Sequence, residues 1–466
     1  MTGVSVSMDG RWLAIGAAAG TAPRNDLWLA DLHASAPESP VLRVVQADVD
    51  ASTSVHVGRD GRLYVATDRD APGGRLCVTD PGTPTYESWT DLVPEDTEAV
   101  LESYAILDGP ELADPVLLCG WTRHAVSEVT VHDLRTGERR RALALPGLGS
   151  VGGIGERPEG GHEAWFGYTD HTTPSSVYRY DARTGEVGVW ARPPGVVEVP
   201  DIRAEQVAYT SADGTTVRMF VMSPTASTPG DPKPTILYGY GGFGVPLTPA
   251  YSAGVLAWVE AGGVYAIANL RGGSEEGEAW HRTGMREHKV NVFEDFHAAA
   301  ERLIADGWTT AKRLAISGGS NGGLLVGAAL TQRPELFAAV VCSAPLLDMV
   351  RYEGFGLGVT WNDEYGSASD PAELGWLLAY SPYHRVQDGV DYPATLFTVF
   401  DGDTRVDPMH ARKLCAALQH ATSGDRPILL RREKNVGHGA RALSRTIELS
   451  VDTLAFCADR TGLGLA

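Results

Sequence analysis

Hydrophobic and polar positions alternate along the first 200 residues in short stretches typical of β-strands. Four of these stretches end in an aspartate, and they read NDLWLAD at Asp31, GRLCVTD at Asp80, SEVTVHD at Asp133 and SVYRYD at Asp181. The aspartates recur roughly every 50 residues, a period typical of β-propeller blades built from four-stranded sheets. The pattern therefore predicts about four blades in residues 1–200, with an ordinary β-sandwich as the alternative.

From residue 201 onward, strand-like and helix-like segments alternate instead. Apolar runs of strand length include PTILYGY (234–240) and RLAIS (313–317), whereas FEDFHAAAERLIADG (293–307) has helical spacing. Alternation of this kind indicates a mostly parallel, doubly wound sheet with helices on both faces. We expect residues 201–466 to form this second domain.

Composition and charge narrow the classes of partner. The 466-residue chain has a formal net charge of −20, and no long run of Lys or Arg interrupts it, so we expect neither nucleic acid nor a membrane as a partner. No apolar run approaches the roughly 18 residues that cross a bilayer, and residues 1–15 do not resemble a signal peptide. The five cysteines form no CxxC pair, which argues against a zinc site or a disulfide framework. We therefore expect a cytoplasmic protein with no metal and no cofactor.

A serine flanked by glycines is the clearest candidate for chemistry. Gly318-Gly319-Ser320-Asn321-Gly322 fits the G-x-S-x-G nucleophile elbow and lies between a predicted strand and a predicted helix, the context that this motif requires in an α/β hydrolase. The backbone amide of Asn321, at the start of the helix, is placed to stabilise an oxyanion on an acylated Ser320. The rival interpretation, a phosphate-binding loop, lacks the lysine that such loops carry. We predict that Ser320 is a nucleophile.

A serine nucleophile needs a base, and the base needs an acid that orients it. In α/β hydrolases the chain order is serine, then acid, then histidine, and His438 follows the last predicted strand in a loop between glycines. The other histidines after the serine, His384, His410 and His420, precede the candidate acids or lie in a predicted helix. For the acid, the sequence offers Asp401, Asp403 and Asp407. We favour Asp403, because Asp401 suits a turn and Asp407 suits a helix cap.

The second half of the chain resembles the prolyl oligopeptidase family of serine peptidases. The resemblance lies in the segments YGYGGFG (238–244), NLRGGSEEGEAWH (269–281), TWNDEYG (360–366) and DGDTRVDPMH (401–410), together with the elbow. It implies an α/β-hydrolase domain joined to a seven-bladed propeller and a catalytic triad of Ser320, Asp403 and His438. It also implies that the Tyr240 hydroxyl and the Asn321 amide form the oxyanion site.

The resemblance further implies a pocket for proline, lined by Phe243, Leu346, Trp361, Tyr365 and Val406. The indole of Trp361 would stack on the flat pyrrolidine ring of the substrate. Arg405 would hydrogen-bond a substrate carbonyl, although an ion pair with Asp401 or Asp407 is an alternative role for it. Leu346 stands where the family often has a smaller side chain, which would narrow the pocket.

These expectations define a function and two alternatives. We expect a monomeric serine endopeptidase that hydrolyses short peptides after proline through an acyl-enzyme. The alternatives are an acylaminoacyl or dipeptidyl peptidase or esterase of the same fold, and a non-catalytic interaction protein built on the propeller. Because only about four of the family's seven blades are countable, we also expect the chain to belong to a longer protein, with about 220 further residues upstream.

Overall fold

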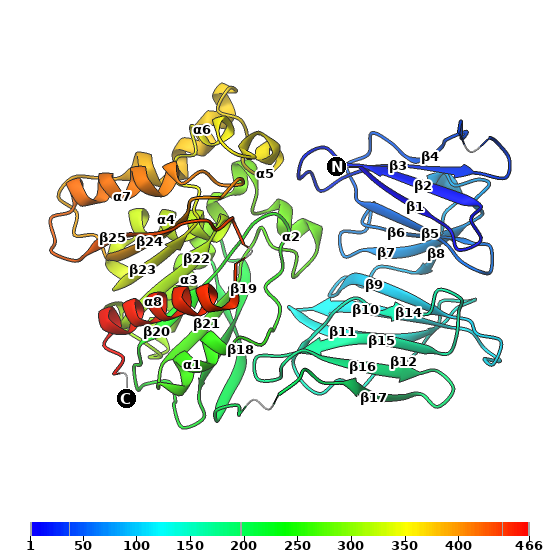
Figure 1. Cartoon of the computed structure of the whole chain (residues 1–466), viewed down its shortest axis with the longest axis horizontal. Coiled ribbons are helices and arrows are strands. Elements are labelled where there is room, and N and C mark those ends of the chain that lie inside the picture. The colour runs from blue at the N-terminus through cyan, green and yellow to red at the C-terminus, as the bar shows by residue number, and fades with distance from the viewer. Residues whose placement is uncertain (1, 37, 196–197, 440, 465–466) are drawn as a thin grey trace. The chain divides into compact units, whose positions relative to one another are not determined.

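The computed structural model describes residues 2–36, 38–195, 198–439 and 441–464, and the chain divides into two compact units (Figure 1). The first, here called the blade unit, consists of Met1–Val196, Thr248–Tyr251 and Glu275–Ala279. The second, called the α/β unit, consists of Val197–Leu247, Ser252–Ser274 and Trp280–Ala466.

The described residues of the blade unit form antiparallel sheets, each built from consecutive strands. The first blade contains β1 (Thr2–Val6), β2 (Trp12–Ala17), β3 (Asp26–Asp31) and β4 (Arg43–Gln46), and the second contains β5 (Thr53–Val57), β6 (Leu63–Thr67), β7 (Arg75–Thr79) and β8 (Thr90–Val93). The third contains β9 (Val100–Leu107), β10 (Val116–Arg123), β11 (Val126–Asp133) and β12 (Arg139–Ala142). The fourth contains β13 (Ser150–Val151), β14 (Gly155–Glu156), β15 (Glu163–Thr169), β16 (Ser176–Asp181) and β17 (Glu186–Ala191). The predicted propeller blades are confirmed.

The repeated aspartate has the same structural role in every blade. It lies where the third long strand ends, and its carboxylate accepts a hydrogen bond from the backbone N–H two residues further on. The four acceptor–donor pairs are Asp31–His33 at 3.0 Å, Asp80–Gly82 at 2.6 Å, Asp133–Arg135 at 2.8 Å and Asp181–Arg183 at 2.9 Å. A short carboxylate side chain makes this bond within a tight turn, so the repeat in the sequence marks the turn before the outermost strand.

Neighbouring blades pack against each other through apolar side chains. One buried cluster joins the first blade to the second and includes Trp12 and Leu63. A second joins the second blade to the third through residues such as Tyr64 and Trp121, and a third cluster, which includes Phe166, joins the third blade to the fourth. Each blade therefore relies on its neighbour to bury its faces.

The α/β unit is built on an eight-stranded sheet with the order β18-β19-β21-β20-β22-β23-β24-β25. The strands are β18 (Ile202–Thr210), β19 (Thr216–Pro224), β20 (Thr235–Tyr238), β21 (Val264–Asn269), β22 (Leu314–Gly319), β23 (Ala339–Ser343), β24 (Ala394–Phe400) and β25 (Ile428–Glu433). β19 pairs antiparallel with both β18 and β21, and the remaining pairs are parallel. The predicted α/β-hydrolase sheet is confirmed.

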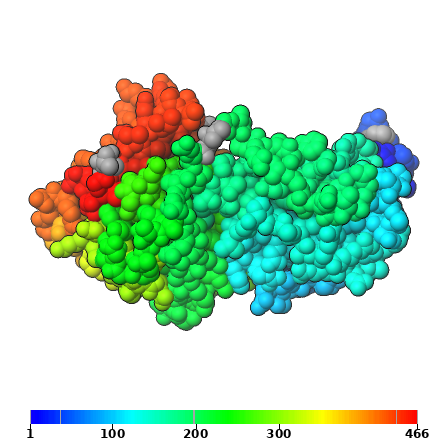
Figure 2. Space-filling view, turned by 90° about the horizontal axis from the view of Figure 1, so that it is seen from below, coloured from blue at the N-terminus to red at the C-terminus, as the bar shows by residue number. Residues whose placement is uncertain are grey.

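Helices cover both faces of this sheet (Figure 1). The helices are α1 (Ala253–Glu260), α2 (Glu278–Arg282), α3 (Val290–Ala305), α4 (Asn321–Gln332), α5 (Asn362–Tyr365), α6 (Pro371–Tyr380), α7 (Met409–Ala421) and α8 (Leu443–Thr461). Successive strand residues face opposite layers, as Ile236 packs with α1 and α8 and Leu237 packs with α3 and α4. α8 lies on the surface of the unit (Figure 2) and exposes Leu443, Ile447 and Val451. Among the described residues, no helix is long and apolar enough to cross a membrane.

Candidate active site

Ser320 occupies a sharp turn between β22 and α4. Its backbone has φ 56° and ψ −118°, a conformation that side chains with a Cβ rarely adopt. A Cβ on Gly318 would lie 2.1 Å from the carbonyl oxygen of Gly322, and a Cβ on Gly322 would lie 2.7 Å from the carbonyl oxygen of Gly239. A Cβ on Gly319 would make only an ordinary 3.7 Å contact. The turn thus requires the two glycines of the motif, and Gly319 is not sterically required.

Asp403 follows β24 and His438 follows β25, and the two side chains meet beyond the ends of these strands. The Nδ1 atom of His438 lies 2.7 Å from Oδ2 of Asp403, and the Asp403 side chain is almost fully buried. Its other oxygen, Oδ1, accepts hydrogen bonds from the backbone N–H groups of Arg405 at 2.9 Å and Val406 at 3.0 Å. Burial raises the pKa of Asp403, but the bonds from His438 and Val406 outweigh it, so that the pKa is lowered overall. The carboxylate is therefore charged at neutral pH and fixes the imidazole.

The other two candidate acids have different partners. Asp401 is exposed and forms an ion pair with Arg432 at 2.7 Å. The carboxylate of Asp407 accepts a hydrogen bond from the N–H of Met409 at 2.8 Å, where α7 begins. Neither is hydrogen-bonded to His438 in the described part of the chain. The contacts support Asp403 as the orienting acid.

Ser320 is close to Tyr240, which follows β20. Burial raises the pKa of Tyr240 to about 12, although a hydrogen bond with the Ser320 side chain acts in the opposite direction. The phenol therefore stays protonated and can donate at neutral pH. Within residues 198–439, no direct hydrogen bond joins Ser320 to His438. Catalytic hydrogen bonds are often long in a free site and shorten once substrate is bound.

The Asn321 side chain, which is almost fully buried, links the elbow to the Tyr240 loop. Its Nδ2 atom donates to the Tyr240 carbonyl oxygen at 2.6 Å, and its Oδ1 atom accepts from the Tyr365 hydroxyl at 2.8 Å. Both polar atoms of the side chain are thus held by neighbours, which fixes the backbone at the N-terminus of α4. That N-terminus presents N–H groups to a developing negative charge.

The residues expected to line a proline pocket form an aromatic cluster with apolar neighbours. The ring centroid of Phe243 lies 6.5 Å from Trp361 and 5.5 Å from Tyr365, both in edge-to-face geometry. Leu346 and Val406 are buried and belong to the same apolar core. Trp361 is only partly buried, so part of its indole is accessible.

Arg405 is exposed next to this cluster. Among the described residues its guanidinium forms no ion pair, and Asp401 pairs with Arg432 instead. The alternative role of Arg405 in an ion pair with Asp401 or Asp407 therefore has no support in the structure. The side chain is available to a ligand.

A buried charged cluster behind the Tyr240 loop was not predicted from the sequence. Lys289, Glu364 and His281 are each less than 5 % exposed. Lys289 Nζ lies 2.7 Å from Glu364 Oε1, and His281 Nε2 lies 2.9 Å from Glu364 Oε2. The only signal in the sequence is that His281 and Glu364 fall inside segments that resemble the family.

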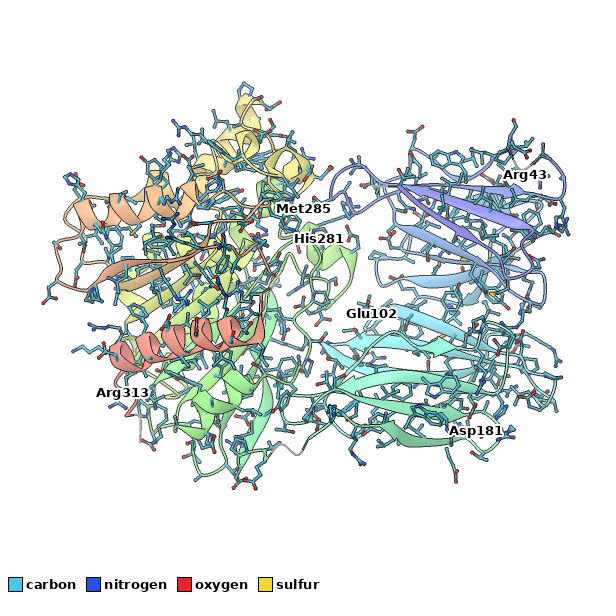
Figure 3. All side chains as sticks on the ribbon, in the orientation of Figure 1. Arg43, Glu102, Asp181, His281, Met285 and Arg313 are labelled. Carbon is cyan, nitrogen blue, oxygen red and sulfur yellow. The ribbon has the colours of Figure 1, made fainter. Side chains whose placement is uncertain are left out.

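Elsewhere, one group of side chains in the described residues has metal-ligand spacing. Atoms of His162, Glu163 and Asp181 lie within 4.8 Å of one another in the fourth blade, where Figure 3 labels Asp181 on β16. Arg157 and Arg179 bind Glu163 at 2.9 and 3.1 Å, and other arginine contacts hold Asp181. Carboxylates neutralised by arginine suit ion pairs better than a cation.

The fold and the elbow define the class of the protein, an α/β hydrolase joined to propeller blades. Two family models agree with this class and leave little of the chain unmatched. The model described as the prolyl oligopeptidase family matches residues 249–463, and the model described as the prolyl oligopeptidase N-terminal β-propeller domain matches residues 1–193. The chain belongs to the prolyl oligopeptidase family.

Named relatives and solved structures are similar over almost the whole chain. A prolyl endopeptidase of Elizabethkingia meningoseptica is 37 % identical over 99 % of this chain, and prolyl oligopeptidase A of Amanita bisporigera is 32 % identical over 99 %. A structure from a study of two prolyl endopeptidases superposes with a TM-score of 0.93 at 43 % identity and covers 100 % of this chain. Prolyl oligopeptidase B of Galerina marginata, bound to a 35mer substrate, also gives a TM-score of 0.93, at 29 % identity over 100 % of this chain.

The coverage is one-sided. This chain spans 64 % of the Elizabethkingia meningoseptica protein and 61 % of the Amanita bisporigera protein. It spans 66 % of each of the two solved chains. The chain thus corresponds to just under two thirds of the length of these relatives.

Proposed function

We propose that the chain is a serine endopeptidase that hydrolyses short peptides on the C-terminal side of proline. The observation that supports it most strongly is a strained Ser320 at the elbow of the same unit in which the buried Asp403 carboxylate is hydrogen-bonded to His438. The relatives named as prolyl endopeptidases, which are similar over almost the whole chain, point to the same reaction.

In this proposal His438 takes the proton from Ser320 Oγ as the oxygen attacks the peptide carbonyl carbon. Asp403 holds Nδ1 of the imidazole protonated, so that Nε2 is the basic atom and the imidazolium is stabilised once formed. The proton then passes from His438 to the leaving amine, and water hydrolyses the acyl-enzyme by the reverse sequence. Ser320 and His438 have to approach each other as substrate binds.

The negative charge of the tetrahedral intermediate forms on the carbonyl oxygen. The Tyr240 hydroxyl, kept protonated by burial, and the Asn321 amide are the two proposed donors. Donors held in place before reaction stabilise this charge without reorganising, and removing one such donor slows catalysis about 10²–10³-fold. Tyr240 therefore contributes to kcat more than to KM.

The pocket accounts for selectivity in this proposal. Phe243, Trp361 and Tyr365 present aromatic surface, and a proline ring is flat, rigid and apolar. The exposed guanidinium of Arg405 is proposed to hydrogen-bond a carbonyl of the bound peptide. Both features favour a short extended peptide with proline before the cleaved bond.

Two measurements test this function. A fluorophosphonate probe should add its phosphonyl group to the wild-type chain, detected by intact mass, and should leave Ser320→Ala unmodified. Matched peptides with Pro, Ala, Phe or Arg before the scissile bond should then give the highest kcat/KM for Pro. Labelling without a preference for Pro would leave a serine hydrolase of another specificity, and an absence of labelling would contradict the function.

A further inference from the structure

Burying the charged cluster of Lys289, Glu364 and His281 costs desolvation free energy, and a role in stabilising the fold does not account for such a cluster. Removing charges from water is unfavourable, and replacing a buried ion pair by apolar residues is often neutral or stabilising. Lys289 and Glu364 are each no more than 2 % exposed, and His281, labelled in Figure 3 on α2, is buried beside them. A cluster of this kind suggests a role in orienting its neighbours.

The contacts of the cluster lead directly to the proposed oxyanion donors. Lys289 Nζ donates to the carbonyl oxygen of Gly241 at 2.9 Å, and Gly241 directly follows Tyr240 in the chain. Glu364 directly precedes Tyr365, whose ring centroid lies 5.3 Å from Lys289 Nζ. Lys289 therefore contacts both the loop of Tyr240 and the short helix α5.

These contacts close into a ring. From Lys289 the ring runs through Glu364 to Tyr365, and from the Tyr365 hydroxyl to the Asn321 side chain at 2.8 Å. Asn321 returns to the Tyr240 carbonyl at 2.6 Å, and Lys289 holds the next carbonyl, that of Gly241. Tyr240 and Asn321, which supply the proposed oxyanion donors, are thus connected in two ways. One connection is their direct hydrogen bond, and the other runs through Gly241, Lys289, Glu364 and Tyr365.

The charges matter as well as the hydrogen bonds. The negative charge of Glu364 is one of the causes that raise the pKa of Tyr240, after burial, so this carboxylate acts on the phenol electrostatically. Without a positive partner, Glu364 would oppose the negative charge that forms beside Tyr240 during reaction. Lys289 supplies that partner at 2.7 Å.

We propose that Lys289 and Glu364 are positioning residues of the oxyanion site, which fix the Tyr240–Gly241 backbone relative to Asn321 and keep the site free of net negative charge. This inference rests on the proposed function, because it assumes that Tyr240 stabilises an oxyanion. Lys289 acts through Tyr240 and does not touch the substrate.

The test compares Lys289→Met in the wild-type background and in a Tyr240→Phe background. Because loss of one oxyanion donor costs about 10²–10³-fold, we expect K289M to lower kcat for a proline peptide by about 10–100-fold with KM changed only a few-fold. In Y240F the same substitution should cost less than about threefold, since the group it positions is gone. The affinity for a proline aldehyde, to which Ser320 Oγ adds as a tetrahedral adduct, should fall with kcat, while that for a product peptide ending in proline should not.

Two further variants separate positioning from folding. K289M/E364Q removes both charges at nearly constant volume and keeps an acceptor for His281. Its kcat should therefore be at least about fivefold higher than that of K289M, but lower than that of wild type. Lys413→Met is the matched control, because Lys413 pairs with the buried Asp348 in the same unit. K413M should lower the thermal unfolding temperature without changing the ratio of aldehyde to product affinity.

The outcomes distinguish this inference from the function beneath it. Equal losses for K289M in both backgrounds, a loss confined to KM, or wild-type kcat in K289M/E364Q would overturn the positioning role while the wild-type chain remains an active peptidase. If K289M does not fold, the kcat of K289M/E364Q alone tests the positioning role. A value below that of wild type is expected, and a value equal to wild type would overturn the role. A wild-type chain that neither cleaves proline peptides nor binds the aldehyde would overturn the proposed function, and this inference with it.

Discussion

Replacing Asp403 by Asn should disable the base without removing any packing. Oδ1 of Asp403 accepts two backbone N–H groups, from Arg405 and Val406, and Oδ2 faces His438. In D403N the amide oxygen has to stay with the two N–H donors, because the opposite orientation would place an NH₂ group against them. The NH₂ group then faces Nδ1 of His438. That nitrogen must become an acceptor, which moves the imidazole proton to Nε2, toward Ser320, and leaves no base there.

The size of the effect follows from these bonds. Turning the amide would leave the part-buried Val406 N–H and the exposed Arg405 N–H without their acceptor. An unpaired buried N–H costs about 1–3 kcal/mol and an exposed one costs less, so the unproductive orientation is favoured by about 2–4 kcal/mol in total. At about 1.36 kcal/mol per tenfold, only about 3×10⁻² to 10⁻³ of the molecules then hold the productive tautomer at a given moment. We therefore expect the tautomer alone to lower kcat by about 30- to 10³-fold. The lost carboxylate charge, which stabilises the imidazolium, adds to this loss and brings it toward the roughly 10⁴-fold typical of such triads.

The assay is steady-state hydrolysis of a proline peptide by D403N and by Asp401→Asn. The second variant makes the same chemical change two residues away, at an exposed carboxylate that pairs with Arg432, and should keep activity within about twofold. Thermal unfolding of both variants shows whether the fold is retained. A D403N variant that keeps more than about a tenth of the activity, or a D401N variant that loses as much as D403N, would contradict this role of Asp403.

Three other predictions concern the pocket, the elbow and the blade unit. Trp361→Ala should weaken transition-state binding of proline peptides, measured from kcat/KM, by about 1–3 kcal/mol, and that of alanine peptides by less. Equal losses of kcat/KM for the two kinds of peptide would contradict the stacking role. Gly318→Ala should lower the free energy of unfolding by at least about 1–3 kcal/mol, since its Cβ would lie 2.1 Å from the Gly322 carbonyl oxygen. Gly319→Ala should lower the free energy of unfolding by less than about 1 kcal/mol. Equal losses for Gly318→Ala and Gly319→Ala in denaturant unfolding would be inconsistent with the turn geometry. Burial raises the pKa of Glu156 from 4.5 to about 7, so its contribution to stability is complete below pH 4.5 and is lost as the pH rises through 7. Glu156→Gln should therefore exceed wild type in unfolding free energy by about 1–3 kcal/mol at pH 8 and equal it at pH 4, and no difference at pH 8 would contradict the pKa.

The parts of the structure that the sequence predicted are those with a local physical cause. A blade repeats every roughly 50 residues because each sheet ends in the same turn, and the carboxylates of Asp31, Asp80, Asp133 and Asp181 make the same bond in it. The nucleophile elbow could be recognised from the sequence because Gly318 and Gly322 leave room for a turn that larger residues at these positions would obstruct. Gly319 lies in the same motif and has no such requirement, so glycine alone did not reveal which positions are constrained.

The parts that the sequence did not predict depend on contacts between distant segments. Lys289 and Glu364 lie 75 residues apart, and neither the periodicity nor the composition around a lysine indicates that its amine will be buried. The link from Asn321 to both Tyr240 and Tyr365 is equally hidden, because the sequence suggested a role only for the Asn321 backbone amide. The choice among Asp401, Asp403 and Asp407 also required the fold, since all three follow the same strand within a few residues.

Mapping cleavage sites in a mixed library of short peptides by mass spectrometry decides whether Ser320 cleaves peptides after proline. We expect that new C-termini produced by the wild-type chain end in proline, and that Ser320→Ala produces none. New C-termini that end mainly in arginine or phenylalanine, or cleavage that persists in Ser320→Ala, would contradict this function.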